Sequence, residues 1–515
     1  MANPLNDALL APLQGRDRPL MHLPDGATVS GADFHALCVR TAGALATAGL
    51  VPGDRVVVQA AKCPGMLAVY GGAVMAGVVF LPLNTAYTPE EVAYFLEDCG
   101  AALLIADPAR AEALTPVAAR CGARLETLAP DGTGSFDALT AAQPDRFDPV
   151  PRGPEDLAAL LYTSGTTGRS KGAMLTQTNL LSNAEALRDL WRFTDRDVLL
   201  HALPVFHTHG LFVATNITLL AGGSMIFLPG FDAEKVIAAL PQATAMMGVP
   251  TFYTRLLDDP RLTRDLVAHM RLFVSGSAPL LAETHVAWEE RTGHRILERY
   301  GMTETNMITS NPYDGERRAG TVGFALPGVE VRVTDPDTGT PLPTGETGMI
   351  EVRGPNVFRG YWNMPDKTAA EFRADGFFIT GDLGRFDVDG YLSVVGRQKD
   401  LIITGGYNVY PKEVELLLDE APDVRESAVI GVPHPDFGEA VLGVLVPEAG
   451  AHPDLDAIAD ALRPRIARFK QPKALVTVPE LPRNSMGKVQ KNLLRDRFAG
   501  HFAPAQPHGT QAGKA

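Results

Sequence analysis

Short apolar runs alternate with amphipathic stretches through about the first 400 residues of the chain. Continuous apolar runs of strand length occur at 54–60, 78–83, 102–107 and 157–163. Apolar residues recur at helical spacing in 90–100 and 177–191. Strands that are buried on both faces have few polar positions. The alternation therefore predicts an α/β fold in which helices cover layered sheets.

The pattern changes at about residue 317, where Gly and Pro separate short β-type runs. These runs lie at 329–335, 348–354 and 391–397, and they predict a β-rich subdomain. Residues 411–420 and 454–469 then predict helices, with strands expected at 426–432 and 441–447. We therefore predict three parts: a large N-terminal domain (1–398), a small mobile α+β C-terminal domain (399–500) and a disordered tail (501–515).

One uncharged stretch, residues 65–84, has the length of a membrane span. It contains Gly71, Gly72, Gly77 and Pro82, so a buried helix ending near Gly77 and then a buried strand fit it better. The first residues have no basic segment followed by an apolar core, so we expect no secretory signal. The net charge of −14 is spread along the chain and disfavours nucleic acid or an anionic membrane as the main partner. Four cysteines without metal-type spacing indicate buried thiols in a reducing cytoplasm.

Residues 163–172 read TSGTTGRSKG and concentrate hydroxyls, glycines and two cations after an apolar strand. Backbone N–H groups freed by Gly, together with Lys171, have the chemistry of a phosphate-binding loop. The spacing does not match the common G-x-x-x-x-G-K-[ST] loop. A solvated polar loop is the alternative for such a run taken alone.

Four further motifs follow in order: ERYGMTE (298–304), TGD (380–382), GRQKD (396–400) and PRNSMGKVQK (482–491). The set resembles the adenylate-forming enzymes, which include acyl-CoA synthetases, adenylation domains and luciferases. The resemblance extends from about residue 25 to 498. It implies that a carboxylate attacks the α-phosphorus of ATP to give an acyl-adenylate, and that a thiol such as that of CoA then displaces AMP.

The resemblance also implies roles in ATP binding. Lys171 and the loop before it would hold the β- and γ-phosphates, and Glu304 would bind Mg²⁺ as a hard oxygen ligand. Asp382 would accept hydrogen bonds from the ribose hydroxyls with help from Arg397. The remaining residues assigned to ATP are Thr163, Ser164, Gly165, Thr166, Thr167, Gly168, Ser277, Ala278, Glu298, Tyr300 and Thr303.

The small domain would supply a second set of groups. Lys488 matches the lysine that the family requires for adenylate formation, and Lys399 matches the hinge at which the small domain rotates. Gly405 and Gly406 match the loop that lines the CoA channel. Lys488, Lys171 and His207 are the expected catalytic residues.

Arg299 departs from the family pattern, in which the residue before the Tyr-Gly pair is usually uncharged. Arg255, His207 and Ser277 fall on segments that line the acyl pocket in the family. Two arginines buried in an acyl pocket need an anion, which the second carboxylate of a small dicarboxylic acid would supply. Pairing of these arginines with Glu298, Asp258 or Asp259 is the alternative.

The runs around Arg299, His207 and Arg255 are similar to those of bacterial malonyl-CoA synthetases, which implies malonate, and next methylmalonate, as substrate. A ligase for another small acid and an enzyme that loads a carrier protein stay open, as does a non-catalytic nucleotide-binding protein. We expect a cytoplasmic monomer that uses ATP, CoA and Mg²⁺.

Overall fold

The computed structural model describes residues 2–163, 170–404, 407–484 and 487–502. The chain divides into two compact units. Unit 1 comprises residues 1–332 and 351–379, and unit 2 comprises 333–350 and 380–515. This division separates the predicted β-rich subdomain between the two units. The predicted boundary at residue 399 stays a prediction.

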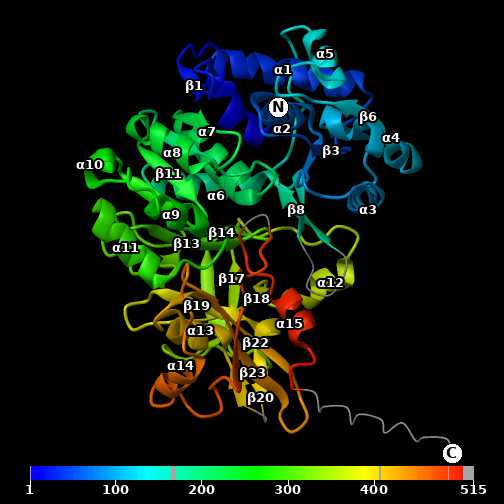
Figure 1. Ribbon diagram of the computed structural model, residues 1–515. Helices are drawn as coiled ribbons and strands as arrows, with labels where there is room; N and C mark the ends of the chain where they lie inside the picture. Colours follow the sequence, from blue (N-terminus) through cyan, green and yellow to red (C-terminus); the bar gives the residue numbers. More distant parts are fainter. Residues whose placement is uncertain (1, 164–169, 405–406, 485–486, 503–515) are drawn as a thin grey trace, which may run out of the picture. The chain divides into compact units, whose positions relative to one another are not determined.

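Unit 1 contains a six-stranded sheet in the order β6-β5-β3-β4-β7-β8, drawn in blue and cyan in Figure 1. Neighbouring strands are parallel except for the final pair, β7 and β8. The strands are β3 (Arg55–Gln59), β4 (Val79–Pro82), β5 (Leu103–Ala106), β6 (Arg124–Thr127), β7 (Leu157–Thr163) and β8 (Lys171–Thr176). The helices of this region are α1 (Gly31–Thr47), α2 (Pro64–Ala76), α3 (Pro89–Cys99), α4 (Ala111–Arg120) and α5 (Ser135–Ala141), with a 3₁₀ turn η3 (Pro108–Arg110).

The predicted helices and strands of this region are confirmed. Helix α3 begins at a capping box, in which Thr88 and Glu91 satisfy each other's backbone N–H groups, and ends at Gly100 in the left-handed conformation. Helix α2 likewise ends at Gly77, and β4 follows it, as predicted from residues 65–84. Within the described residues, no helix is long and apolar enough to cross a membrane.

The second sheet of unit 1 has nine strands in the order β15-β14-β13-β12-β11-β9-β10-β1-β2. Strands β1, β10, β9, β11, β12 and β13 are successively parallel, whereas β2, β14 and β15 join antiparallel. The strands are β1 (Pro19–His22), β2 (Thr28–Ser30), β9 (Val198–His201), β10 (Ser224–Phe227), β11 (Ala245–Gly248), β12 (Leu272–Ser275), β13 (Leu297–Met302), β14 (Asn306–Ser310) and β15 (Phe324–Ala325).

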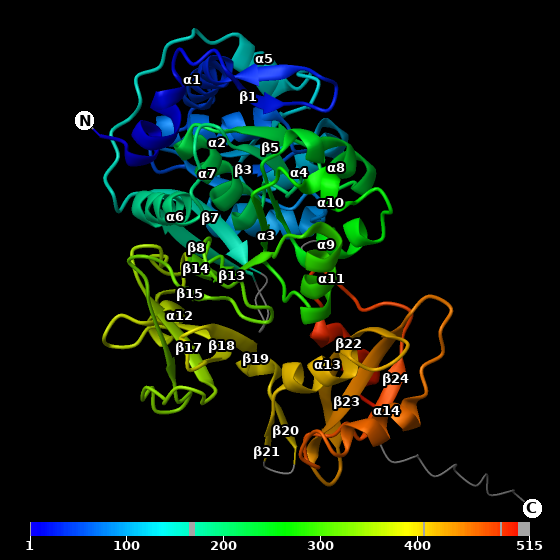
Figure 2. The same ribbon diagram turned by 90° about the vertical axis from the view of Figure 1, so that its left-hand side faces the viewer.

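Helices α8 to α11, drawn in green in Figure 2, accompany this sheet. Its core includes Trp288 of α11 and Tyr253 of α9, whose rings meet edge to face at 5.0 Å. The helices are α6 (Gln177–Leu190), α7 (Asn216–Ala221), α8 (Ala233–Ala239), α9 (Pro250–Leu257), α10 (Arg264–Val267) and α11 (Ala282–Thr292). Two π-helical segments are η1 (Asn6–Leu10) and η4 (His209–Thr215), and two 3₁₀ turns are η2 (Ala11–Leu13) and η5 (Leu240–Gln242).

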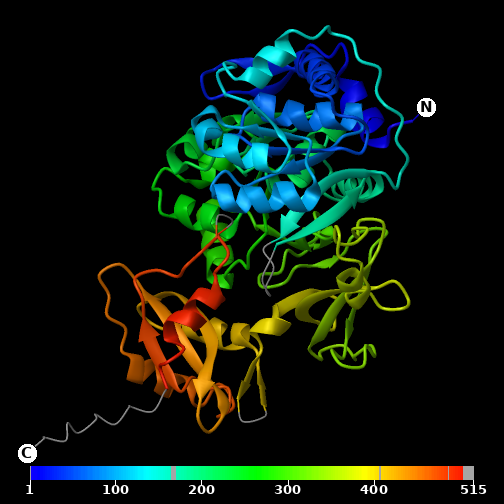
Figure 3. The ribbon, with the colours of Figure 1, turned by 90° about the vertical axis from the view of Figure 1, so that its right-hand side faces the viewer.

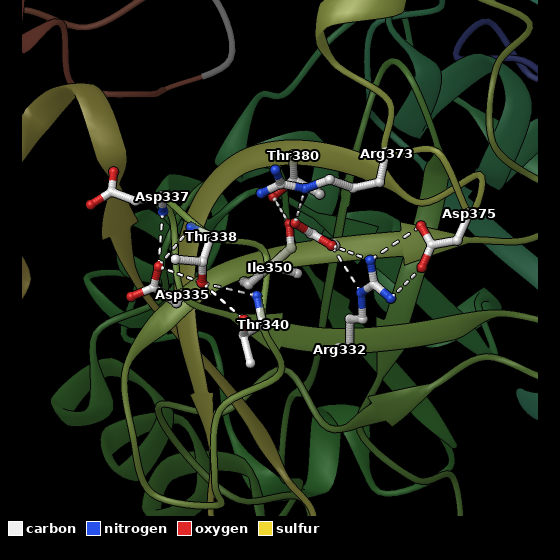
Figure 4. A network of polar contacts seen from close by, with 10 residues as sticks. Arg332, Asp335, Asp337, Thr338, Thr340, Ile350, Arg373, Asp375 and Thr380 are labelled. Carbon is white, nitrogen blue, oxygen red and sulfur yellow. Dashed lines mark hydrogen bonds and ion pairs between the residues drawn. The ribbon is translucent and has the colours of Figure 1, made fainter.

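A third sheet has the order β16-β17-β18-β19 and includes residues of both units. Its strands are β16 (Glu330–Thr334), β17 (Gly348–Arg353), β18 (Phe378–Phe386) and β19 (Leu392–Arg397), with helix α12 (Pro365–Ala370) between β17 and β18 in sequence. Figure 4 shows the polar contacts here, in which Arg332 reaches Asp375. The fully buried Glu351 is held between Arg332 and Arg373. Two guanidinium groups compensate this carboxylate, which would otherwise be costly to bury.

The C-terminal part of unit 2 is a mixed sheet, in which β24 pairs with β23 beside the order β21-β20-β23-β22. Helix α15, red in Figure 3, packs Leu494 into the apolar cluster on one face of these strands. Helices α13 and α14 contribute Leu418 and Leu462 to a second apolar cluster of this sheet. The elements are η6 (Gln398–Asp400), β20 (Ile402–Thr404), β21 (Tyr407–Val409), α13 (Pro411–Asp419), β22 (Val424–His434), β23 (Gly438–Pro447), α14 (Leu455–Leu462), β24 (Ala474–Thr477) and α15 (Lys491–Phe498).

One prediction for this region needs correction. The helix predicted over 454–469 is α14, which ends at Leu462, because Pro464 lacks the backbone N–H that would continue the helical hydrogen bonds. The disordered tail at 501–515 stays a prediction; of its first residues, Phe502 packs against the apolar cluster and lies 5.3 Å from the ring of His434. Residues 503–515 lie outside the described residues.

Candidate active site

Three parallel strands of unit 1 bring the predicted acyl-side residues to one edge of the nine-stranded sheet. Strands β11 and β12 end at Gly248 and Ser275, and the N–H of Gly276 donates to the carbonyl of Gly248 at 3.3 Å. Strand β13 beside them carries Arg299. Ligands of α/β proteins characteristically bind at the carboxyl ends of such strands.

The Arg299 side chain is buried at this edge, and its residue is only 4% exposed. Its Nε and Nη2 atoms have no hydrogen-bond partner among the described residues. Burial lowers the pKa of Arg299 to about 9, since no carboxylate among the described residues pairs with it. Burying a guanidinium in this way is costly, and an anion that entered would compensate it.

Two polar side chains lie beside this guanidinium. His209 is fully buried in η4, and its Nδ1 is 3.3 Å from Oγ of Ser277. Burial, with the charge of Arg299 as a further cause, lowers the pKa of His209 well below its usual value, so its imidazole is neutral. Ser277 has a φ of 72°, a conformation that non-glycine residues seldom adopt and that is concentrated at functional sites.

The other predicted residues near this edge show different degrees of burial. His207 is half-buried, and its Nδ1 accepts a hydrogen bond from the N–H of His209 at 3.3 Å. Ala278, Tyr300 and Thr303 are half-buried. Glu298 is buried, and its carboxylate lies 3.3 Å from Nδ1 of His285.

The prediction of a second buried arginine is wrong. Arg255 is exposed near the end of α9, because that helix turns Tyr253 and Leu256 towards the core. Neither Arg255 nor Arg299 forms an ion pair within the described residues. The alternative pairing fails as well, since Asp259 binds Arg261 and Glu298 lies against His285. One buried guanidinium is therefore left at the sheet edge.

The phosphate-side residues of unit 1 meet where β7 and β8 pair. Thr163 ends β7 opposite Lys171, the first residue of β8. The intervening predicted residues Ser164, Gly165, Thr166, Thr167 and Gly168 lie outside the described residues. Lys171 Nζ is 3.3 Å from Glu371 Oε1 and 4.1 Å from the ring centre of Tyr361.

Glu304 is compatible with the predicted magnesium site. It is buried, and the hydroxyl of Tyr361 lies 3.0 Å from its Oε1. Among the described residues, no group of three or more His, Cys, Asp or Glu side chains is placed to hold a metal. Mg²⁺ that is shared with a nucleotide takes only one or two protein carboxylates and completes its shell with phosphate and water. Glu304 therefore fits as a single protein ligand.

In unit 2, the antiparallel pairing of β18 and β19 places Asp382 opposite Arg397. The Nε of Arg397 is 2.6 Å from Oδ1 of the buried Asp382. The hydroxyl of Thr380 accepts from the N–H of Asp382 and donates to the carbonyl of Ile350. The TGD and GR motifs, which are separated in sequence, thus form one polar group.

Lys488 is near this group within unit 2. The pKa of Lys488 is lowered to about 8, mainly by burial and also by the charges of Arg397 and Lys399, while Asp382 and Asp400 act in the opposite direction. The residue as a whole is nevertheless exposed. The backbone N–H of Lys488 donates to Oδ1 of Asn484 at 3.0 Å, which fixes the turn that carries it.

The predicted hinge residue Lys399 is exposed in η6. Its neighbour Asp400 forms an ion pair with Arg495 of α15 at 2.8 Å. This ion pair connects η6, the predicted hinge segment, to helix α15 within unit 2. Gly405 and Gly406, predicted to line the CoA channel, lie outside the described residues.

Sequence reasoning missed four residues of these sites: His209, Gly276, Tyr361 and Glu371. His209 is the second histidine of the HTH run, so the run itself contained a signal. Gly276 and Tyr361 occur in ordinary-looking segments. Glu371 follows α12, and no motif near it indicates that it contacts Lys171.

These features belong to a known class of enzyme. The sequence model of the AMP-binding enzyme family matches residues 11–362, and that of the AMP-binding enzyme C-terminal domain matches 413–488. The chain belongs to the AMP-binding enzyme family. Its fold is that of ATP-bound MatB from Rhodopseudomonas palustris, with a TM-score of 0.96 and 55% identity over 98% of this chain and 100% of that one.

Relatives at lower identity act on dissimilar acids. A malonate–CoA ligase of Arabidopsis thaliana is 35% identical, covering 87% of this chain and 78% of the relative. A feruloyl-CoA synthase of an Amycolatopsis species is 38% identical, covering 92% and 94%. Overall sequence identity to these relatives therefore does not show which carboxylic acid is the substrate, and the residues of the acyl pocket have to be considered.

Proposed function

We propose that this protein activates malonate as an acyl-adenylate and transfers it to CoA, giving malonyl-CoA, AMP and pyrophosphate. The AMP-forming ligation of an acid to CoA follows from family membership and from the likeness to MatB. The choice of acid rests on Arg299. Methylmalonate would be the second substrate, because a methyl group leaves both carboxylates in place.

The buried guanidinium of Arg299, whose Nε and Nη2 have no hydrogen-bond partner among the described residues, is the single observation that favours a dicarboxylic acid. One carboxylate of malonate would react with ATP while the other paired with Arg299, and Ser277 and His207 would line the same pocket. A ferulate-like or fatty acid has no second anion and would leave the charge uncompensated. A site built to pair a charge rejects analogues that lack it by about 10⁴-fold. Arg255 is exposed, so it adds no buried charge to this argument, and its contact with the substrate stays a prediction.

The other groups would act on ATP. Lys171 and Thr163 would bind the phosphates, Asp382 and Arg397 the ribose, and Lys488 would stabilise the charge that develops during adenylate formation. Glu304 would hold Mg²⁺, which supplies neutralisation of the triphosphate charge when bound. The further predicted ATP contacts, including Ala278, Glu298, Tyr300 and Thr303, stay proposals, as do a hinge at Lys399 and a monomer acting in the cytoplasm.

The direct test measures AMP release with ATP, Mg²⁺ and CoA for malonate, methylmalonate, succinate, acetate and butyrate. Turnover confined to malonate and methylmalonate supports the proposal, whereas turnover on acetate or butyrate contradicts it. Arg299→Gln should abolish the preference for diacids while the KM for ATP stays unchanged. The control Arg264→Gln, at an exposed arginine of α10, should leave both unchanged. Replacing CoA by a phosphopantetheinylated carrier protein tests the alternative acceptor.

A further inference from the structure

The lysine assigned to the ATP phosphates already has an anionic partner inside unit 1. Lys171 Nζ lies 3.3 Å from Oε1 of Glu371, the residue that follows α12, and above the ring of Tyr361. The side chains of Lys171 and Glu371 are only 18% and 19% exposed. An ion pair shielded from water in this way is stronger than a surface pair, and breaking it carries a cost.

Glu371 has two further partners. Lys367, one turn earlier on α12, places its Nζ 2.7 Å from the same Oε1 atom, and the Tyr361 hydroxyl lies 2.6 Å from Oε2. Burial raises the pKa of Glu371, but its contacts with Lys367, Tyr361 and Lys171 outweigh burial and leave that pKa below its usual value. Glu371 is therefore ionised near neutral pH.

Tyr361 connects this pair to the proposed magnesium ligand. Its oxygen is also 3.0 Å from Oε1 of Glu304, so one phenolic proton lies between two carboxylates. A tyrosine donates only one hydrogen bond. The carboxylate that accepts this hydrogen bond is stabilised as an anion relative to the other carboxylate.

We propose that Glu371 is the counter-anion of Lys171 when no nucleotide is bound, and that it sets the affinity for ATP by competing with the phosphates. The inference rests on the proposed role of Lys171. On binding, Lys171 exchanges Glu371 Oε1 for a phosphate oxygen. The ammonium of Lys367 stays paired with Glu371, and the hydroxyl of Tyr361 donates its hydrogen bond to Glu371, so the charge of this carboxylate remains compensated. Glu304 then no longer accepts that hydrogen bond and is available to bind Mg²⁺. Glu371 is thus a positioning residue that acts through Lys171.

Three variants give effects of different sign. Glu371→Gln removes the competing charge and keeps the shape, so the Kd for ATP·Mg²⁺ should fall by about threefold or more. Lys367→Met removes the other cation and strengthens the hold of Glu371 on Lys171, so that Kd should rise by a similar factor. Tyr361→Phe leaves Glu304 without this donor, so less Mg²⁺ should be needed for half-maximal ATP binding. A purely structural role of Glu371 would lower the melting temperature without tightening ATP binding.

The decisive experiment is calorimetric titration of ATP·Mg²⁺, without acid or CoA, into the full-length wild type, Glu371→Gln, Lys171→Met and the double variant. The inference predicts that Glu371→Gln tightens binding only when Lys171 is present. Unchanged or weaker binding by Glu371→Gln, with weaker binding by Lys171→Met, would overturn the inference and leave the proposed function intact. Unchanged binding by Lys171→Met would overturn both. Should Glu371→Gln fail to fold, Glu371→Asp, which withdraws the carboxylate, should shift the Kd in the same direction.

Discussion

The guanidinium of Arg299 lies directly against the backbone of Gly276. A Cβ atom added at Gly276 would be 2.4 Å from Cζ of Arg299, which is far inside van der Waals contact. The absence of a side chain at residue 276 is therefore what gives this guanidinium its place at the edge of the nine-stranded sheet. Under the proposed role of Arg299, this relationship links a backbone feature of the loop after β12 to the choice of substrate.

Gly276→Ala should displace the Arg299 side chain and weaken malonate binding. We expect the KM for malonate to rise by about tenfold or more, corresponding to about 1.4 kcal/mol, with a much smaller change in the KM for ATP. Steady-state kinetics with each substrate varied would measure this. Gly230→Ala is the matched control, since a Cβ there meets nothing within 4 Å. An unchanged KM for malonate in Gly276→Ala would show that Arg299 does not contact the acid.

Lys488→Ala should separate the two half-reactions. Because the ammonium of Lys488 is near Asp382 and Arg397, its loss should remove adenylate formation, measured as malonate-dependent exchange of pyrophosphate into ATP. Thioester formation from supplied malonyl-adenylate and CoA should continue. The exposed Lys473, replaced by Ala, serves as the control. Equal loss of both half-reactions would contradict the role proposed for Lys488.

Helices α1 and α2 approach closely at Gly72. A Cβ at this position would lie 2.7 Å from Cγ2 of Thr41 and 2.9 Å from the backbone nitrogen of Ala42. Gly72→Ala should destabilise unit 1 by about 1–3 kcal/mol through overpacking. Urea denaturation followed by tryptophan fluorescence is suitable, because all three tryptophans lie in unit 1.

Gly43→Ala on α1 provides the matched control. The nearest atoms to a Cβ at Gly43 belong to the flexible side chain of Gln143, at 3.2 Å and beyond, so they are able to move. Alanine is also a better helix former than glycine by about 0.5–1 kcal/mol. Gly43→Ala should therefore be neutral or slightly stabilising. Equal destabilisation by both substitutions would show that helix packing at Gly72 is not the cause.

Asp197 should make the stability of unit 1 depend on acid pH. Burial raises the pKa of this carboxylate. Arg271 at 2.5 Å and hydrogen bonds from Thr194 and Thr244 lower the pKa by more than burial raises it, so the pKa of Asp197 lies below its usual value. The unfolded chain then binds the proton more tightly than the folded one. The stabilisation is complete above about pH 3.9 and is lost as the pH falls through the lowered folded value.

Asp197→Asn should lower the free energy of unfolding by about 3 kcal/mol at pH 7, because Arg271 loses its anionic partner. The difference from wild type should narrow as the pH falls below about 3.9 towards the lowered pKa of folded Asp197, at which the wild-type carboxylate also becomes protonated. Asp189→Asn, at a side chain that is 69% exposed, should stay within about 0.5 kcal/mol of wild type. A difference that does not vary with pH would argue against this assignment.

The sequence by itself determined the local structure and the class of chemistry. Runs such as 157–163 and the cap around Thr88 specify β7 and α3 because strand burial and helix capping depend on neighbouring residues. The ordered motifs indicated the enzyme family, and the phosphate loop, the ribose contact of Asp382 and the catalytic role of Lys488 that they imply stay predictions. Helix α14 was predicted too long because the effect of Pro464 was not taken into account.

The tertiary structure decided which charges are buried and which meet. Arg255 and Arg299 are equally charged in the sequence, but one faces outwards on α9 and the other lies at a crowded sheet edge. The contact between Lys171 and Glu371 joins residues that are far apart along the chain. Burial and ion pairing depend on how distant strands and helices pack, so local residue patterns specify the candidate groups but not their partners.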